Sequence, residues 1–254
     1  MKLASFFLTL FTLAALQTNG QRATPDKLDT KKGPLTIQPV QHALTVLKWD
    51  NKTIYVDPAG GANFFSGLDT PDMILITDIH GDHMDSKTLE AINTSKATFV
   101  VPQAVADMLP ASYKPKVVVL ANGAKTTKFG VTVTAVPMYN LPETPDSRHP
   151  KGRGNGYVIN VGDKNIYFSG DTEDITEMRT LKNIDVAFVC MNLPFTMDVD
   201  QAAQGVLAFK PKVVYPYHYR GQGGLSDVNA FKTQVNAGDS KIDVRLRNWY
   251  PGSN

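Results

Sequence analysis

One stretch, residues 73–85, limits the fold and chemistry of this chain more than any other segment. It begins with an apolar run from Met73 to Ile76, which predicts a buried strand. The run breaks into five side chains that can bind a metal ion: Asp78, His80, Asp82, His83 and Asp85. Because side chains alternate along an extended backbone, one subset would serve one metal and the remainder a second. A solvated acidic loop is the alternative, but two of the chain's five histidines lie here, which favours metal binding.

Other predicted strands also end at polar side chains. Asp171 follows one strand, His218 follows another, and the segment 140–149 follows a third. In open α/β sheets, ligands gather at the carboxyl ends of strands. Residues 163–171 also repeat the pattern of residues 51–57, with a turn, a lysine, an Ile-Tyr strand and a final aspartate. The repeat suggests two related halves within one domain, although it is short enough for chance to be the alternative.

Apolar periodicity and turn residues predict a chain that mixes strands and helices. We expect strands at residues 35–40, 42–49, 53–58, 97–101, 117–120, 126–129, 131–136, 185–191 and 213–216. We expect helices at residues 86–92, 103–109, 172–181 and 199–209, with Ser86 or Asp85 as the N-cap of the first. Cys190, the single cysteine, lies in an apolar run, which predicts a buried structural thiol.

The composition is that of an ordinary soluble protein with a sizeable core. The chain has 254 residues, of which 42% are hydrophobic, enough for one large domain or two small ones. Its formal net charge of +2 gives no field that would favour nucleic acid as a partner. The partner we expect is a small-molecule substrate, and the oligomeric state is left open.

The N-terminus has the plan of a signal peptide. Lys2 precedes an apolar run that ends at Leu16, and Thr18 and Gly20 are small residues before a cleavage point. The run is shorter than the ~20 residues that span a bilayer, so we expect no stable membrane insertion after cleavage. An uncleaved anchor is the alternative. We predict a signal peptide at 1–20, a linker at 21–34, a single domain at 35–254, and a secreted or periplasmic protein.

Several ordered motifs carry a resemblance to a known family. They are His42-Ala43, 55–58 (Tyr-Val-Asp-Pro), 154–159 (Gly-Asn-Gly-Tyr-Val-Ile), 166–172 (Ile-Tyr-Phe-Ser-Gly-Asp-Thr) and 216–219 (Pro-Tyr-His-Tyr). With the 78–83 segment, they resemble the metallo-β-lactamase superfamily, whose signature is His-x-His-x-Asp-His followed by a His, a bridging Asp and a final His. The most similar branch holds the L-ascorbate-6-phosphate lactonases and the N-acyl-phosphatidylethanolamine phospholipase D type enzymes. The resemblance runs from about Leu35 to His218 and implies an α/β fold, an αββα sandwich of two mixed sheets with outer helices.

The chain departs from the family pattern at two positions. Asp78 stands where the family usually has His, so one metal gains an oxygen ligand and a negative charge, which favours Mn or Fe although Zn is still suitable. Asn140 stands where many relatives place the downstream His. His149 is the only nearby histidine that can replace it, and we predict that it does.

The resemblance then implies a dinuclear centre. We expect Asp78, His80 and His149 at one divalent ion (Zn or Mn, or else Fe), Asp82, His83 and His218 at the other, and Asp171 between them. Two such ions hold a hydroxide nucleophile at neutral pH. Asp82 would hold that hydroxide and pass its proton to the leaving group, so Asp82 and Asp171 are the predicted catalytic residues.

Other residues near these motifs have predicted supporting roles. Asp57 would orient a ligand histidine or else cap a turn, and His42 and Asn140 would support the ligands or else have only structural roles. Lys151 and Arg153 would bind an anionic group of the substrate, with surface solubility as the alternative. Tyr219 would donate a hydrogen bond to a substrate oxygen or else only pack.

These features together predict an exported metal-dependent hydrolase that acts on an ester-like bond. A lactone or a phosphodiester ranks ahead of a β-lactam as its substrate. One alternative is a binding protein with a degenerate site, for which Asp78 and Asn140 are the grounds. A di-iron redox role is the third option, but it usually requires a flavin domain or sulfur chemistry that this chain lacks.

Overall fold

The computed structural model describes residues 22–144 and 146–250. The predicted signal peptide, residues 1–20, lies outside this range. Within the described ranges, no helix has the length and apolar character needed to cross a membrane.

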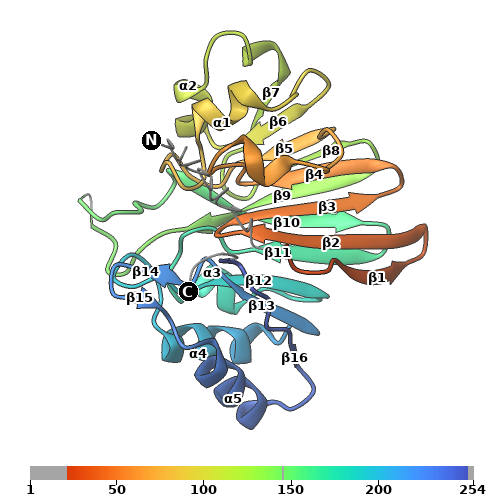
Figure 1. The fold of residues 1–254 in the computed structure, drawn as a ribbon. Helices are drawn as coiled ribbons and strands as arrows, with labels where there is room; N and C mark the ends of the chain where they lie inside the picture. The colour runs from red at the N-terminus through yellow and green to blue at the C-terminus, as the bar shows by residue number, and fades with distance from the viewer. Residues whose placement is uncertain (1–21, 145, 251–254) are drawn as a thin grey trace, which may run out of the picture.

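Two seven-stranded sheets form the centre of the molecule (Figure 1). The first sheet contains, in order, β1 (Asp26–Thr30), β2 (Gly33–Gln41), β3 (Leu44–Trp49), β4 (Lys52–Val56), β5 (Met73–Leu75), β6 (Thr98–Val101) and β7 (Val117–Val119). The second contains, from one edge to the other, β8 (Lys125–Lys128), β9 (Val131–Met138), β10 (Gly154–Val161), β11 (Lys164–Phe168), β12 (Val186–Cys190), β13 (Val213–Tyr217) and β16 (Asp243–Val244). A small hairpin, β14 (Arg220–Gly221) and β15 (Gly224–Leu225), stands apart from both.

The two sheets follow the same plan. In the first, pairing is antiparallel from β1 to β4 and parallel from β4 to β7. In the second, it is antiparallel from β8 to β11 and parallel from β11 through β12 and β13 to β16. The strands of the predicted repeat, β4 and β11, therefore occupy the same position in their sheets, which supports the expectation of two related halves.

Helices cover the outer faces of both sheets (Figure 1). They are α1 (Ser86–Ala91) and α2 (Gln103–Met108) on the first sheet, and α3 (Thr176–Arg179), α4 (Val199–Phe209) and α5 (Val228–Gly238) on the second. Two short 3-10 helices, Ala62–Phe65 and Lys114–Lys116, lie in loops. Asp85, and not Ser86, caps α1 by accepting a hydrogen bond from the Lys87 amide. This arrangement confirms the predicted αββα sandwich.

Alternation along the strands assigns each side chain to one of two cores. In β5, Met73 and Leu75 face the core between the sheets, whereas Ile74 and Ile76 just beyond it face the core under α1 and α2. Cys190 is fully buried in the core between the sheets, and burial raises the pKa of its thiol to about 11. The thiol is therefore protonated at neutral pH, as expected for a structural cysteine.

Two expectations about local structure are wrong. Residues 26–30, placed in the linker, form β1, because they pair with β2 along all five positions and Leu28 packs against the core. The helix expected at 172–181 shrinks to α3, because the Glu173 amide donates to the Tyr139 carbonyl and the Ile175 amide donates to the Glu173 carbonyl. These contacts hold residues 172–175 in a turn.

The edge strand β1 is tied to the C-terminal segment by a partly buried ion pair. Asp26 accepts hydrogen bonds from Arg247 at 2.9 and 2.6 Å and from the Tyr215 hydroxyl at 2.8 Å. Burial alone would raise the pKa of the Asp26 carboxyl, but these donors together lower it. A carboxyl with a lowered pKa stabilises the fold above its unfolded pKa of about 3.9, and the contribution is lost as the pH falls through the folded value.

We expect Asp26→Asn to lower the free energy of unfolding by about 1 kcal/mol at pH 7, because the variant loses this ion pair. The difference from wild type should shrink below about pH 3.9, where the unfolded carboxyl becomes protonated, and disappear once the native carboxyl is protonated as well. Urea denaturation at pH 7 and pH 3 measures both values. Equal stability of the two proteins at pH 7 would show that the pair contributes nothing.

Candidate metal centre

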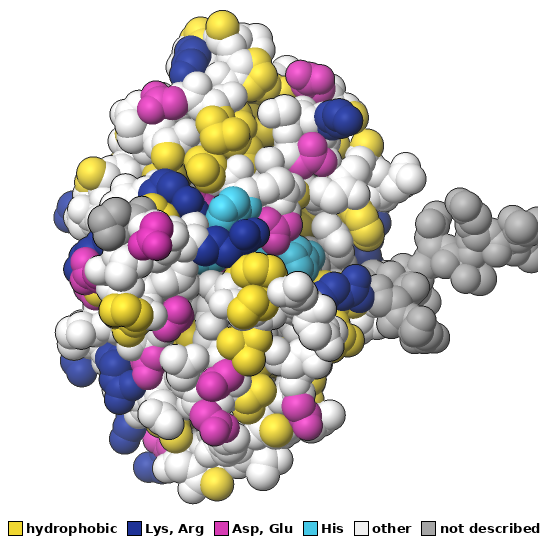
Figure 2. All heavy atoms as spheres, turned by 90° about the vertical axis from the view of Figure 1, so that its left-hand side faces the viewer, with side chains coloured by type: hydrophobic (Ala, Val, Ile, Leu, Met, Phe, Trp, Pro, Cys, Tyr) yellow, Lys and Arg dark blue, Asp and Glu magenta, His cyan; other side chains and the backbone are white. Residues whose placement is uncertain are grey.

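All five histidines of the chain meet at one edge of the sandwich. They lie beside three aspartates that follow β5 and β11, and the eight side chains are His42, Asp78, His80, Asp82, His83, His149, Asp171 and His218. Figure 2 looks onto this edge and shows histidine side chains in the middle of the face, among basic and acidic ones. Residues far apart in sequence therefore converge where the strands end, as the sequence predicts.

The first group of side chains contains Asp78, His80 and His149. The Asp78 Oδ2 atom lies 2.8 Å from His80 Nδ1 and 3.9 Å from His149 Nε2. Asp78 and His149 are fully buried, and His80 is partly exposed. This is the set that we predicted for the first ion.

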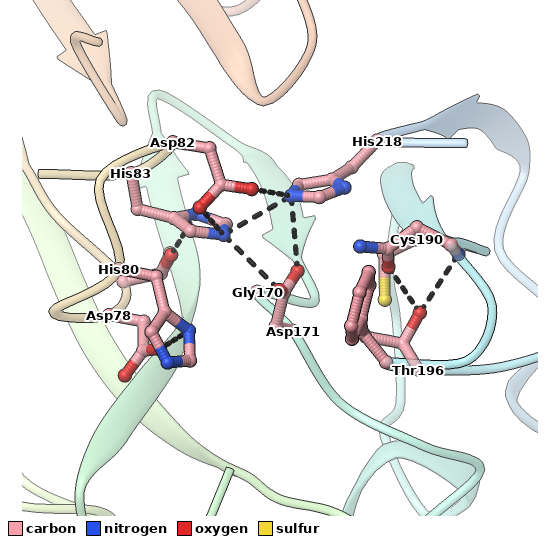
Figure 3. A network of polar contacts seen from close by, with 12 residues as sticks. Asp78, His80, Asp82, His83, Gly170, Asp171, Cys190, Thr196 and His218 are labelled. Atoms are coloured by element: carbon pink, nitrogen blue, oxygen red, sulfur yellow. Dashed lines mark hydrogen bonds and ion pairs between the residues drawn. The ribbon is translucent and has the colours of Figure 1, made fainter. Parts of the chain in front are cut away.

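The second group contains His83, Asp171 and His218, which face one another in Figure 3. The His83 and His218 Nε2 atoms lie 3.2 Å apart. Asp171 Oδ2 is 3.3 Å from His83 Nε2 and 3.2 Å from His149 Nε2, and its Oδ1 is 3.4 Å from His218 Nε2. Asp171 thus contacts histidines of both groups, which is the position expected of a bridging carboxylate.

Asp82 completes the second group from the solvent side. Its Oδ2 atom lies 3.3 Å from His218 Nε2, and its Oδ1 atom lies 3.9 Å from His83 Nε2. Its side chain is 41% exposed, whereas the Asp78 and Asp171 side chains are at most 4% exposed. Asp82 is therefore the aspartate of the cluster that a substrate can reach.

Asp57 holds His83 in one orientation. This buried carboxylate accepts hydrogen bonds from the Thr77 amide and hydroxyl, both at 2.8 Å, and its Oδ2 atom lies 2.9 Å from His83 Nδ1. A carboxylate accepts, so the neutral ring carries its proton on Nδ1 and directs the Nε2 lone pair at the cluster. Of the two predictions for Asp57, the structure supports the one in which it orients a ligand histidine.

Asn140 does the same for His149. Its Oδ1 atom lies 3.0 Å from His149 Nδ1 and accepts from the His149 amide at 2.8 Å. Its Nδ2 donates to the Phe195 carbonyl at 2.9 Å and to Glu173 at 3.2 Å, which fixes the orientation of the amide. Both ends of Asn140 are occupied, so His149 is the residue that presents a free nitrogen to the cluster.

His42 reaches the cluster with a partner that sequence reasoning missed. Its Nε2 atom lies 3.1 Å from Asp82 Oδ2, and its Nδ1 atom lies 2.8 Å from the Tyr250 hydroxyl. The Tyr250 hydroxyl also accepts from the Arg220 amide at 2.9 Å. Tyr250 lies outside the motifs, so only the folded chain brings it to His42.

Two of the three predicted substrate-binding residues are engaged elsewhere. The Lys151 ammonium contacts Glu143 at 3.1 Å and Glu177 at 3.2 Å, so its charge is already paired. The Tyr219 hydroxyl donates to the Arg247 carbonyl at 3.2 Å and the side chain is buried, which favours the alternative in which Tyr219 packs over a contact with the substrate. Arg153 lies in the cluster, but its guanidinium binds Asp78.

The histidines of the cluster lower the pKa values of its aspartates. Burial alone would raise the pKa of Asp171, but His218 and His83, when protonated, hold it well below the usual range. For Asp82, burial is likewise outweighed by the contacts with His218 and His42, which lower its pKa. The aspartates are therefore ionised at neutral pH, as metal ligands must be.

The donor set suits divalent metal ions. His149 Nε2 and Asp171 Oδ1 are buried and form no hydrogen bond with any residue in the described ranges. Asp57, Asp78, Asp82 and Asp171 against one guanidinium give the cluster a net charge of −3 when the histidines are neutral. Since an excess of negative charge in a largely buried cluster is costly, bound cations would compensate this charge and pair with the unpaired atoms.

Comparisons with known proteins agree with this geometry. A family model described as a beta-lactamase superfamily domain matches residues 36–218. The chain belongs to the metallo-β-lactamase superfamily. A UPF0173 metal-dependent hydrolase from Pyrococcus horikoshii is 32% identical over 181 residues, which cover 69% of this chain and 78% of that protein. One from Staphylococcus saprophyticus is 29% identical and covers 76% of this chain and 90% of that protein.

Solved structures of other proteins show the same fold. A protein from Parabacteroides distasonis has 38% sequence identity and a TM-score of 0.78, and the match covers 89% of this chain and 98% of that one. Igni18, a metallo hydrolase from Ignicoccus hospitalis, has a TM-score of 0.72 at 23% identity, which shows the fold alone. The predicted class, a metal-dependent hydrolase of the metallo-β-lactamase superfamily, is thus confirmed, and the narrower lactonase or phospholipase branch stays a prediction.

Proposed function

We propose that this metallo-β-lactamase superfamily member hydrolyses an ester-like bond with the help of two divalent metal ions. Asp78, His80 and His149 would hold one ion, Asp82, His83 and His218 the other, and Asp171 would contact both. The observation that carries the proposal is the position of Asp171, whose carboxylate lies within 3.4 Å of histidine nitrogens from both groups. When bound, such ions activate water and polarise the bond that is cleaved.

The residues of the chain would do the remaining work. Asp82, the exposed carboxylate of the cluster, is placed to accept a proton from the attacking water and pass it to the leaving group. His42 contacts the same carboxylate at 3.1 Å and is held by Tyr250, so it would keep Asp82 in position. The buried Asp57 and Asn140 would fix His83 and His149 without contacting the substrate.

The loops around the cluster support a small substrate with an apolar part. Leu141, Leu193 and Leu225 are exposed, and each lies on a loop or hairpin that follows a strand at this edge. These segments are linked to the cluster, since Asn140 donates to the Phe195 carbonyl and the Gln222 amide donates to the Leu193 carbonyl. These leucines would pack against an apolar substituent of the substrate, for which a lactone or a phosphodiester ranks ahead of a β-lactam.

The proposal is tested by assaying the mature protein, loaded with Mn, Zn or Fe, against lactones, bis-p-nitrophenyl phosphate and nitrocefin. We expect turnover of a lactone or of the phosphodiester that stops when the metal is removed with a chelator. Turnover that survives the double change His80→Ala and Asp171→Ala would contradict the proposed chemistry. Metal binding without turnover of any substrate would favour a binding protein instead. Export is proposed from the N-terminal sequence alone, and cell fractionation tests it.

A further inference from the structure

Asp78 is already held by a positive charge. Arg153 donates two parallel hydrogen bonds to the Asp78 carboxylate, from Nε to Oδ1 at 3.0 Å and from Nη2 to Oδ2 at 2.9 Å. The Asp78 side chain is fully buried, and that of Arg153 is 20% exposed. A forked, charge-assisted pair that is shielded from water is among the strongest polar contacts in proteins.

The backbone imposes this pair. The Asn155 amide donates to the Thr77 carbonyl at 2.9 Å, which fastens the start of β10 to the residue before Asp78. A Cβ atom on Gly154 would lie 2.8 Å from the same carbonyl, so only glycine allows the two segments to approach this closely. Arg153 therefore starts next to Asp78, and the contact does not depend on a chance orientation of a long side chain.

The Arg153 guanidinium makes the carboxylate of the first group less available to a cation than the carboxylates of the second group. Asp78 Oδ2, the oxygen that faces His80 and His149, is the same atom that binds Arg153 Nη2. A cation that binds this oxygen must share it with a guanidinium, which repels it. Within the described ranges, Asp82 and Asp171 form ion pairs only with histidines.

We propose that Arg153 competes with metal for Asp78 and makes the protein bind its two ions with unequal affinity. One ion binds tightly to Asp82, His83, Asp171 and His218. The second binds weakly to Asp78, His80 and His149. This inference rests on the proposed two-metal function and adds to it the order in which the ions are bound.

Two physical effects of Arg153 oppose each other, and the experiment separates them. A residue that only orients a metal ligand typically contributes about 10–100-fold to metal affinity, so its loss would weaken binding. A competing positive charge does the opposite, and its loss would strengthen binding. Arg153→Met removes the charge and keeps the bulk of the side chain, whereas Arg153→Lys keeps the charge and loses the fork.

The experiment titrates Mn²⁺, and separately Zn²⁺, into the metal-free full-length protein by calorimetry. We expect wild type to bind one ion tightly and a second at least about 10-fold more weakly, a difference of about 1.4 kcal/mol. Arg153→Met should bind the second ion about 10-fold more tightly and leave the first unchanged. Arg153→Lys should retain the weak second site.

Control variants assign each binding event to its ligands. Asp78→Ala should abolish only the weak event, and His218→Ala should abolish the tight one. Two events of equal affinity in wild type, or a weaker second event in Arg153→Met, would overturn the inference while leaving the proposed function intact. A wild-type protein that binds no metal would instead overturn the proposed function. Two events of equal affinity in wild type would overturn the inference even if a variant does not fold.

Discussion

Asp171→Asn is expected to lower kcat/KM by about 10³-fold, or roughly 4 kcal/mol of transition-state stabilisation. Asp171 is 3% exposed and contacts histidine nitrogens of both groups with its two oxygens. An amide of the same shape offers one oxygen and no charge, so it cannot serve both groups. Steady-state kinetics on the substrate found in the panel, together with metal analysis of the purified variant, measures the effect.

Asp163→Asn is the matched control for this change. Asp163 carries the same side chain at the turn that leads into β11, where it pairs with Lys164. We expect it to leave kcat/KM within about twofold of wild type, because surface ion pairs contribute little. If Asp171→Asn keeps more than a tenth of wild-type activity with two bound ions, Asp171 does not bridge the groups.

Asp57→Asn is expected to weaken metal binding about 10–100-fold and to lower the free energy of unfolding by about 1–3 kcal/mol. Asp57 is completely buried and satisfies three donors: the amide and hydroxyl of Thr77 and Nδ1 of His83. An asparagine has only one acceptor atom, so it leaves at least one of these donors without a partner. Calorimetric titration and urea denaturation give the two values.

Asp72→Asn is the control that separates a loss of metal affinity from a loss of stability. Asp72 is also a buried carboxylate that accepts from a backbone amide, that of Thr53 at 3.0 Å, but it precedes β5 at the opposite end of that strand. Its replacement should reduce stability and leave metal affinity unchanged. A loss of metal affinity as large as that of Asp57→Asn would mean that the effect comes from general destabilisation.

Much of the site could be predicted because its ligands lie in short segments directly after strands. Apolar runs locate the strands, and the order of the sheet then brings their carboxyl ends together, which is how Asp78, Asp171 and His218 meet. The choice of His149 over Asn140 followed from the small number of histidines. The structure adds the reason, since each polar end of Asn140 already has a partner.

What the sequence could not predict depends on contacts between distant segments. Arg153 and Asp78 are 75 positions apart, and nothing in either segment indicates that the arginine would bind a metal ligand instead of a substrate. Tyr250 reaches His42 only because the C-terminal segment crosses the sandwich. The polar β1 segment is a strand because β2 and Arg247 hold it, and local composition carries no sign of either.

The division of the chain into two sheets has a consequence for its integrity. The first sheet and its loops supply Asp78, His80, Asp82 and His83, whereas the second supplies His149, Asp171 and His218. Neither sheet supplies a complete set of donors for one ion, so each bound ion would cross-link the two sheets. By mass action, an ion present at 1,000 times its dissociation constant would add about 4 kcal/mol to that attachment. In cells starved of metal, the protein would then be less stable as well as inactive.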